Sequence, residues 1–494
     1  MTLIDILNYI DSNFTERHLG KIQEFIKQPS ISATGEGVRE TAEILLRKIE
    51  SLGGTNVHLA ETMGEEFGHP QVYGEIKSPK NKPTILFYSM YDVQPVYPDK
   101  WILNSKKINP FGAEIHEYEW FPGFSGKCLM NRGVMNQKGP TMAAFNVLET
   151  FLELEGELPV NLIFAIEGEE ELGSPHMLKF IQEYKEQLKS CTAVYFPMFF
   201  ENYDGQIRFY LGVRGVIEAK LWCRGGSWGG PINRNIHSSS SGLVENPIFR
   251  LIEALNSLKN DKNNEILVKG IMDDPKIIGP SSEDLEIIHQ LVKNLNFRDL
   301  KEAMGVNKFR DIQGKELDGE KAIIEQLFTP GLSINGIEGG YYGEGGMTII
   351  PHEVHANLDI RLPPFQEVDY VKNCYKRHLS ENFPMIELIF GPGYGAGKMS
   401  PSHPLIQATK TVYKKFNKIP LFYPLLAGSA PFSLFQNKLN LPFVYGGLGH
   451  AGRAHSPLEY AVLESHDPRV GGIKEFEKFF ATLLVEFHTK LSKN

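Results

Sequence analysis

Four short apolar runs, each followed by turn residues and then by a helical segment, place the strongest constraint on how this chain can fold. They are PTILFYSM at 83–90, PVNLIFAIE at 159–167, TAVYFP at 192–197 and LPFVYGG at 441–447. Runs of this length that alternate with helical periods are typical of an α/β domain with a mixed, largely parallel sheet. Apolar residues also recur at helical spacing in 141–156 and 473–491. We therefore expect both ends of the chain to belong to one layered domain.

The middle of the chain has a different pattern, which predicts a smaller domain of the α+β class. Strand-like segments occur at 216–226 and 348–364, and helical spacing occurs at 246–258 and 365–382. A chain of 494 residues is also too long for one ordinary core. These features together predict an insert within the first domain.

We place this insert at 214–388, so that the first domain consists of 1–213 and 389–494. The charged span 259–325 has the weakest pattern of the whole chain. We expect it to be an irregular excursion within the insert.

Composition and charge exclude several classes of partner. The net charge is −9 and no basic stripe is present, which argues against a nucleic-acid-binding protein. No apolar stretch reaches the roughly 18 residues of a membrane span, so we expect no membrane insertion. The start, MTLIDILNYIDSNF, contains acids and no basic region, as in an amphipathic helix and not a secretory signal. The four cysteines lack CxxC spacing and predict reduced thiols in a cytoplasmic protein.

Polar clusters follow the apolar runs at the points where strands of the predicted sheet end. Asp92 follows the first run, the segment EGEEELGS follows the second, and His450 and His455 follow the last. Ligand sites of open α/β sheets form beyond the carboxyl ends of the strands, so these clusters are expected on one rim. Consecutive carboxylates also suit an exposed helix start. Their place directly after a buried strand favours a role in the site, where two adjacent acids can serve as metal ligand and general base.

Eight segments of the chain, taken in order, carry a resemblance to a known family. They are YDVQP, NRGVMNQKGP, EGEEELGS, YLGVRG, NIHS, PHEVHANLDIRLPP, AGSAP and AHSPLE. They resemble the carnosinase, glutamate carboxypeptidase and acetylornithine deacetylase family of dinuclear metallopeptidases. The resemblance covers nearly the whole chain and implies a catalytic α/β domain interrupted by a lid that forms a homodimer. It also implies a hydrolase acting on the amide bond of a small amino-acid-derived substrate.

The resemblance assigns roles to four residues of the predicted catalytic domain. Asp92 resembles the carboxylate that orients a metal-bound imidazole, and Glu170 resembles the general base that activates water. Glu171 resembles a terminal metal ligand, and His455 resembles the second imidazole ligand. We therefore expect these four side chains to lie together.

The resemblance assigns four further roles to the lid and the loop that follows it. His237 resembles the residue that stabilises the tetrahedral oxyanion in a partner's site. Arg361 resembles a clamp for the carboxylate of the substrate, and Gly428 and Ser429 resemble the loop that cradles the same end of the substrate. His237 is thus an expected catalytic residue, and Arg361, Gly428 and Ser429 are the expected substrate-binding set.

Three of the five metal-ligand positions of the family carry other residues here. Met90 stands where a histidine binds the first metal, and Asn136 stands where a carboxylate bridges the two metals. A further aspartate position falls on Pro197 or Met198, depending on a gap of one residue. Two close divalent cations need an anion between them, and a thioether suits Cu(I) better than zinc or manganese.

The expected cofactor is therefore none, or one divalent metal such as zinc or manganese held by Glu171 and His455. A shifted one-metal site built on Glu169 or His450 is the alternative. Without a metal, Glu170 and its neighbour repel each other, and one of them should take up a proton.

Three functional hypotheses follow from this sequence. The first is an amide-directed enzyme that uses carboxylate acid/base chemistry on a small amino-acid conjugate in a lost or reduced metal site. The second is a dipeptidase or deacylase that keeps one metal or a rebuilt pair. The third is an inactive homologue that binds a small ligand or a protein partner. The retained acid/base and oxyanion residues favour the first hypothesis.

Overall fold

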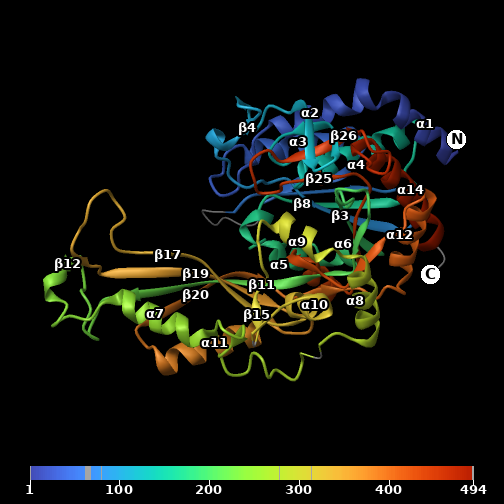
Figure 1. The fold of residues 1–494 in the computed structure, drawn as a ribbon. Coiled ribbons are helices and arrows are strands. Elements are labelled where there is room, and N and C mark those ends of the chain that lie inside the picture. The colour runs from blue at the N-terminus through green and yellow to red at the C-terminus, as the bar shows by residue number, and fades with distance from the viewer. Residues whose placement is uncertain (1, 62–67, 79, 278, 313, 492–494) are drawn as a thin grey trace. The chain divides into compact units, whose positions relative to one another are not determined.

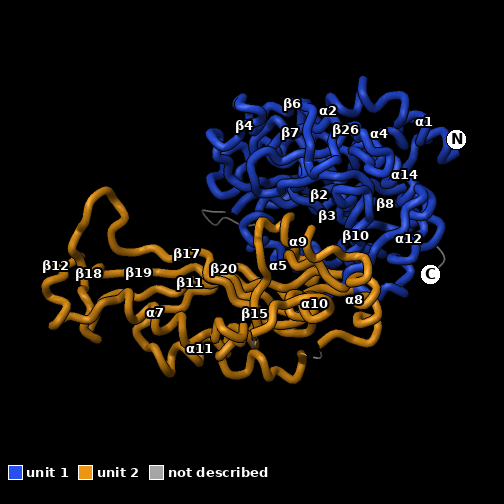
Figure 2. The backbone as a smooth tube through the Cα atoms, viewed as in Figure 1, with its two compact units in different colours: residues 1–211, 399–423, 434–494 blue, residues 212–398, 424–433 orange. Residues whose placement is uncertain are grey.

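The chain folds into two compact units, shown in different colours in Figure 2. The computed structural model describes residues 2–61, 68–78, 80–277, 279–312 and 314–491. The first unit comprises Met1–Leu211, Met399–Tyr423 and Leu434–Asn494, and the second comprises Gly212–Lys398 and Pro424–Ser433. The insert proposed from sequence, 214–388, falls within the second unit, which continues to Lys398 and includes a separate short segment.

A six-stranded sheet forms the centre of the first unit (Figure 1). Its order is β1 (Thr55–Ala60), β2 (Gln71–Ile76), β8 (Asn161–Glu167), β3 (Thr84–Met90), β9 (Ala193–Pro197) and β24 (Phe443–Gly446). The last four strands are parallel to one another. β2 runs antiparallel to its two neighbours, β1 and β8. Each of the four apolar runs contains one of the parallel strands. The predicted mixed, largely parallel sheet is confirmed.

The helices that pack around this sheet are joined by a buried network of polar side chains. α14 (Ile473–Leu491) packs on α1 (Leu3–Asn13), α4 (Lys138–Glu155) and α12 (Pro404–Lys415), and α3 (Val38–Ser51) packs on β1 and β2. Glu477 of α14 accepts a 2.9 Å hydrogen bond from Asn146 of α4 and lies 2.6 Å from Nδ1 of His18. His18 directly precedes α2 (Leu19–Lys27), so this buried network joins three helices.

A four-stranded antiparallel sheet supports the loops that approach the site. Its order is β25 (Ala451–Gly452), β26 (Tyr460–Ser465), β7 (Phe124–Met130) and β6 (Glu114–Phe121). Trp101, Cys128, Met130 and Val462 form part of its buried core. Other short elements of the first unit are α5 (Met177–Glu183), α6 (Lys185–Lys189), β4 (Ile102–Leu103), β5 (Lys106–Lys107), β10 (Arg208–Tyr210) and β22 (Leu421–Tyr423).

The second unit is an α+β domain built on an antiparallel sheet. The sheet order is β17 (Gly331–Glu338), β19 (Glu353–Leu362), β11 (Gly212–Arg224) and β20 (Ile386–Tyr394). α7 (Pro247–Leu258) packs on β11 and β19, and α11 (Val368–Asn382) packs on β20. Short strands complete the unit: β12 (Ile236–His237), β13 (Lys259–Asn260), β14 (Glu265–Ile266), β15 (Asp311–Ile312), β16 (Lys315–Glu316), β18 (Ile349–Ile350), β21 (Gly397–Lys398) and β23 (Leu426–Ser429).

The expectation of an irregular excursion over 259–325 is wrong for much of that span. It contains α8 (Ser282–Asn294), α9 (Phe297–Met304) and the start of α10 (Gly319–Phe328). Side chains of Ser281, Asn296 and Asp318 accept backbone N–H groups at the starts of these helices. These N-cap residues are visible in the sequence, but the many charged residues of the span hide the few apolar residues that mark the buried face of each helix.

None of the helices in the described parts of the chain combines the length and the apolar character that a membrane crossing needs.

Candidate functional site

The candidate site lies where β3 and β8 end side by side. Met90, the last residue of β3, is paired in register with Glu167, the last residue of β8. The loop after β3 carries Asp92, whose side chain is fully buried. Its Oδ1 accepts a 3.2 Å hydrogen bond from the backbone N–H of Glu170, and its Oδ2 accepts a 3.0 Å bond from that of Glu171. Asp92 therefore fixes the acidic loop that follows β8.

Three carboxyl groups of this cluster, those of Asp92, Glu167 and Glu170, have raised pKa values. Burial, followed by the charge of Glu171, raises the pKa of Asp92 to about 7. Burial, again followed by Glu171, raises the pKa of Glu170 well above its ordinary value. Burial also raises the pKa of Glu167 to about 8. Some of these groups therefore hold protons at neutral pH, as expected for close carboxyls in a poorly solvated place.

Unlike Glu169 and Glu171, Glu170 has a carboxylate that accepts no hydrogen bond from any described residue. Its side chain is only partly buried. The backbone of Glu170 is held by Asp92 and by the short 3-10 turn Glu170–Leu172. A fixed backbone with a free carboxyl group is the arrangement that proton transfer to a bound molecule requires.

Asn136, Glu171 and His455 form a closed triangle of contacts. Nδ2 of Asn136 donates a 2.8 Å hydrogen bond to Oε1 of Glu171 and lies 3.0 Å from Nε2 of His455. That imidazole nitrogen lies 3.1 Å from the same Oε1, and this hydrogen bond raises the pKa of His455. Gln94 donates a 2.8 Å bond to the other oxygen of Glu171. The predicted ligand pair is thus adjacent, with an amide joined to both members.

The donor set here does not fit two divalent cations. The amide of Asn136 donates a hydrogen bond to Glu171 and brings no negative charge, and Met90 offers only a buried thioether. Pro197 ends β9, and its backbone oxygen accepts a hydrogen bond from Gln137. Over the described ranges, no group of three or more His, Cys, Asp and Glu side chains is arranged to hold a metal ion.

The residues considered for a shifted metal site are engaged elsewhere. Glu169 accepts a 2.7 Å hydrogen bond from the backbone of His69 and lies 2.8 Å from Nδ1 of His176. His450 contacts the backbone oxygen of Glu201 at 3.0 Å and the hydroxyl of Tyr460 at 2.9 Å. Neither residue contacts the triangle, and each has a structural role in its own surroundings.

Glu459 organises the site and was not singled out in the sequence. Its Oε1 accepts hydrogen bonds from the backbone N–H groups of Met135 at 2.9 Å and Asn136 at 3.0 Å. Its Oε2 accepts bonds from Gly133 at 3.1 Å and from the guanidinium of Arg132 at 2.7 Å. Glu459 ends the segment AHSPLE, but nothing in that segment indicates its partners, which lie far away in the chain. The hydrogen bonds to Glu459 hold the loop that carries Asn136.

The predicted lid residues lie in the second unit. Arg361 donates a 2.7 Å hydrogen bond to the hydroxyl of Ser429 and a 2.6 Å bond to Asp359. Gly428 precedes Ser429 in the short strand β23. His237 is exposed, and Nε2 of its ring lies 3.0 Å from the hydroxyl of Thr348. Arg361, Gly428 and Ser429 are thus brought together, and no contact joins His237 to them within the described residues.

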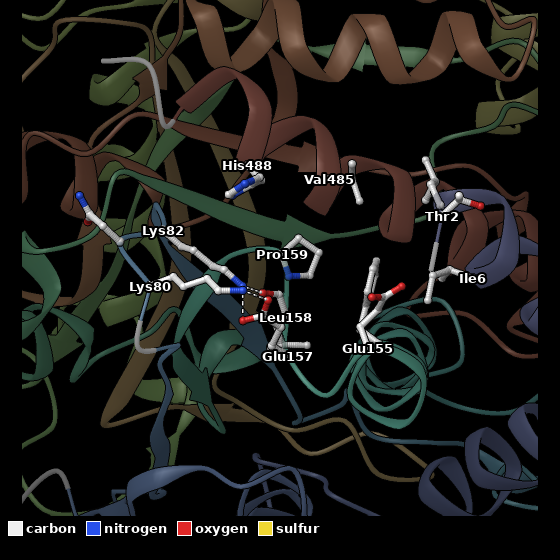
Figure 3. A pocket seen from close by; sticks show the side chains of 13 residues that line it. Thr2, Ile6, Lys80, Lys82, Glu155, Glu157, Leu158, Pro159, Val485 and His488 are labelled. Carbon is white, nitrogen blue, oxygen red and sulfur yellow. Dashed lines mark hydrogen bonds and ion pairs between the residues drawn. The ribbon is translucent and has the colours of Figure 1, made fainter.

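The first unit also contains a cavity of about 580 Å³, whose lining side chains are drawn in Figure 3 and include none of the residues of the candidate site. Pro159, just before β8, and Lys82, just before β3, line it together with His488 of α14. These residues mark the amino ends of the strands, whereas ligand sites of such sheets form at the carboxyl ends. Lys80 and Lys82 both pair with Glu157, so the carboxylate of Glu157 is already engaged.

Comparison with solved structures and family models identifies proteins that share this fold. Residues 228–386 match the model of the M20 peptidase dimerisation domain. The solved M20 metallo-carboxypeptidase of Sulfolobus solfataricus is 29% identical and has a TM-score of 0.80, with 96% of this chain and 100% of that chain covered.

Curated relatives include two dipeptidases. The Cys-Gly metallodipeptidase of Candida albicans is 27% identical over 486 residues, which cover 92% of each protein. Human β-Ala-His dipeptidase is 29% identical over 324 residues, which cover 64% of this chain and only 57% of the human protein. The resemblance predicted from the eight segments is confirmed.

The buried His450 predicts a specific loss of stability in acid. Burial lowers its pKa from 6.5 to about 4, so the folded state binds fewer protons than the unfolded state between these pH values. The contribution of neutral His450 to the free energy of unfolding is therefore fully present above pH 6.5 and falls as the pH is lowered toward 4. In urea unfolding, the free energy of unfolding of wild type should fall by roughly 3 kcal/mol more than that of His450→Gln over this range. The exposed His488→Gln variant should behave as wild type, and equal acid losses in all three proteins would contradict the prediction.

Proposed function

We propose that this chain, a homologue of the M20 metallopeptidases that carries their dimerisation domain, acts on the amide bond of a small amino-acid conjugate or dipeptide-like substrate. The names of its relatives support this substrate class, since they include two dipeptidases and a carboxypeptidase. The observation that carries the proposal is Glu170, whose free carboxyl group has a raised pKa and whose backbone is fixed by Asp92.

The proposed chemistry is acid/base catalysis by Glu170. Its carboxylate takes a proton from a water molecule as the water oxygen bonds to the carbonyl carbon of the substrate. Glu170 then gives this proton to the amide nitrogen as the C–N bond breaks, so that a carboxylic acid and an amine are formed. A positioned acid/base group contributes about 10²- to 10⁴-fold to such rates. Asp92 acts as a positioning residue, because it binds the backbone of the loop and not the substrate.

The triangle of Asn136, Glu171 and His455 is proposed to supply part of the polarisation of the substrate. The hydrogen bond that His455 donates to the carboxylate of Glu171 raises the pKa of His455 and so favours its protonated form. The roles of His237 in stabilising the oxyanion, and of Arg361 with Gly428 and Ser429 in binding the substrate carboxylate, also remain proposals taken from the resemblance.

A second candidate is a dipeptidase or deacylase with one divalent metal. It is favoured by the adjacency of Glu171 and His455, whose ligand atoms lie 3.1 Å apart. A bound zinc or manganese would supply Lewis acidity there. Tight zinc sites use three or four protein ligands, and this pair offers two with an amide beside them. Because Glu171, His455 and the amide of Asn136 are too few for a tight zinc site, acid/base chemistry stays the first candidate. A catalytically inactive homologue that binds a small ligand or a protein partner is the third.

Replacing Glu170 should remove the acid/base group with little change in the fold. We expect Glu170→Gln to lower kcat/KM by about 10²- to 10⁴-fold, measured by mass spectrometry of products on the best substrate from a panel of dipeptides and N-acyl amino acids. Glu169→Gln is the matched control, since its carboxylate serves His69 and His176. Unchanged turnover in Glu170→Gln would exclude the proposed base.

Metal content distinguishes the first two candidates. Purified without chelator and dialysed against zinc and manganese, the wild-type protein should hold less than one ion per chain by mass spectrometry. Restoring Met90→His and Asn136→Asp with an aspartate at Pro197 or Met198 should raise the zinc content toward two, since a bridging anion returns. About one ion in wild type would favour the second candidate. No gain in the restored variants would mean that these positions are not the ancestral ligands.

The second unit is proposed to form a homodimer. The β17 strand lies at the edge of its sheet, and the neighbouring segments leave large apolar side chains exposed. The exposed apolar residues are Leu243, Phe249, Ile252, Ile334, Ile337 and Tyr342. An exposed edge with apolar residues requires a cover, and the dimerisation-domain match supports a second copy as that cover.

Charged substitutions on this surface should separate the two copies. Wild type is expected to have the mass of a dimer in light scattering after size exclusion, and Phe249→Asp combined with Ile337→Asp should shift it to the monomer mass. Both side chains are more than half exposed in the single chain, at 67% and 51%. Ile115→Asp, an equivalent change on the first unit, should leave the dimer intact. A double variant that stays dimeric would place the interface elsewhere.

A further inference from the structure

The second unit contains a cavity of about 370 Å³ that no step of the proposed chemistry uses. α9, α10 and the segment between them form much of its wall. The apolar part of the lining includes Phe297, Leu300, Met304, Phe309, Leu317 and Ile323. Most of these side chains remain partly exposed, so the folded unit leaves apolar surface open toward the cavity. Cavities of roughly 300 Å³ and above are large enough for small ligands.

Arg214 lines the same cavity and carries a buried charge without a paired carboxylate. Its guanidinium donates to the backbone oxygens of Gln326, Thr329 and Arg361, which are neutral acceptors. Only 6% of its surface is exposed, and its Nε–H has no acceptor in the described structure. Burial lowers the pKa of Arg214 to about 10. An anion placed beside it would offset part of the cost of burying this charge.

Glu325 brings an opposite charge to another part of the lining. Its carboxylate accepts a 2.7 Å hydrogen bond from Asn264 and a 3.3 Å bond from the hydroxyl of Thr329. Both donors are neutral, and no ion pair joins Glu325 to Arg214 or to any other described cation within 4.0 Å. Arg310, a second cation of the lining, pairs with Asp261 at 2.9 Å. The cavity therefore presents the cation of Arg214 and the anion of Glu325, which form no ion pair with each other.

We propose that this cavity binds a free amino acid with an apolar side chain, its carboxylate beside Arg214, its ammonium group beside Glu325 and its side chain against the apolar wall. A fatty acid or another simple carboxylate would leave Glu325 without an opposite charge beside it, and an amine would leave Arg214 without one. All the residues of this site belong to the second unit, whereas Glu170 and Glu171 belong to the first. The inference therefore stands whether or not the proposed acid/base chemistry is correct.

Calorimetric titration of the full-length protein with L-phenylalanine and L-leucine tests the site. We expect one molecule bound per chain, and binding at least about tenfold weaker for 3-phenylpropionate and phenethylamine, each of which lacks one charge. Ala322→Trp, which fills the cavity, and the milder Glu325→Gln should each weaken the binding of phenylalanine about tenfold or more. Circular dichroism confirms that each variant is folded.

The Glu171→Gln variant separates this site from the proposed active site, because an amino acid is also a product of the proposed reaction. Binding that survives Glu171→Gln and is weakened by Glu325→Gln supports the cavity. Binding that is lost in Glu171→Gln and unchanged in the two cavity variants would overturn the inference, as would the absence of any phenylalanine or leucine binding at millimolar concentration.

Discussion

The carboxylate of Asp92 connects the two loops from which the candidate site is built. β3 and β8 are parallel neighbours, so their following loops leave the sheet at the same edge. Two backbone hydrogen bonds to a single buried side chain then fix the second loop against the first. The direction of Glu170 and the contact of Glu171 with Asn136 both depend on this connection. Glu459 does the same for the loop that carries Asn136, again by accepting backbone N–H groups.

Much of the first unit was predictable because its central strands are buried on both faces. A strand of this kind needs a continuous apolar run, and β3, β8, β9 and β24 each have one. Strands β6 and β7 mix apolar with charged and polar residues, and β26 ends in Glu464 and Ser465, and no expectation was formed for these strands. In α8 to α10 the caps at Ser281, Asn296 and Asp318 were readable, but the apolar faces are narrow. The role of Glu459 depends on partners far away in the chain, so local pattern could not reveal it.

Sequence also located the clustered acids, but it could not say how they would be satisfied. Glu169 and Glu171 are both acids of one short segment, yet the structure directs the first toward His69 and His176 and the second toward Asn136 and His455. Which acid faces which partner follows from the turn after β8 and from the two backbone bonds to Asp92. A run of like residues in sequence therefore separates into a structural acid and site acids only once the loop is fixed in three dimensions.

The amide at position 136 affects the electrostatics of the whole cluster. A bridging carboxylate beside Glu171 requires cations to hold the negative charges together, whereas the Asn136 amide donates a hydrogen bond to Glu171 directly. With hydrogen bonds in that role, the remaining carboxyl groups reduce their repulsion by retaining protons, and burial raises the pKa of Asp92 to about 7 and that of Glu167 to about 8. A neutral amide at this position thus goes together with carboxyl groups that gain and lose protons near neutral pH. General acid/base catalysis at neutral pH requires groups of that kind.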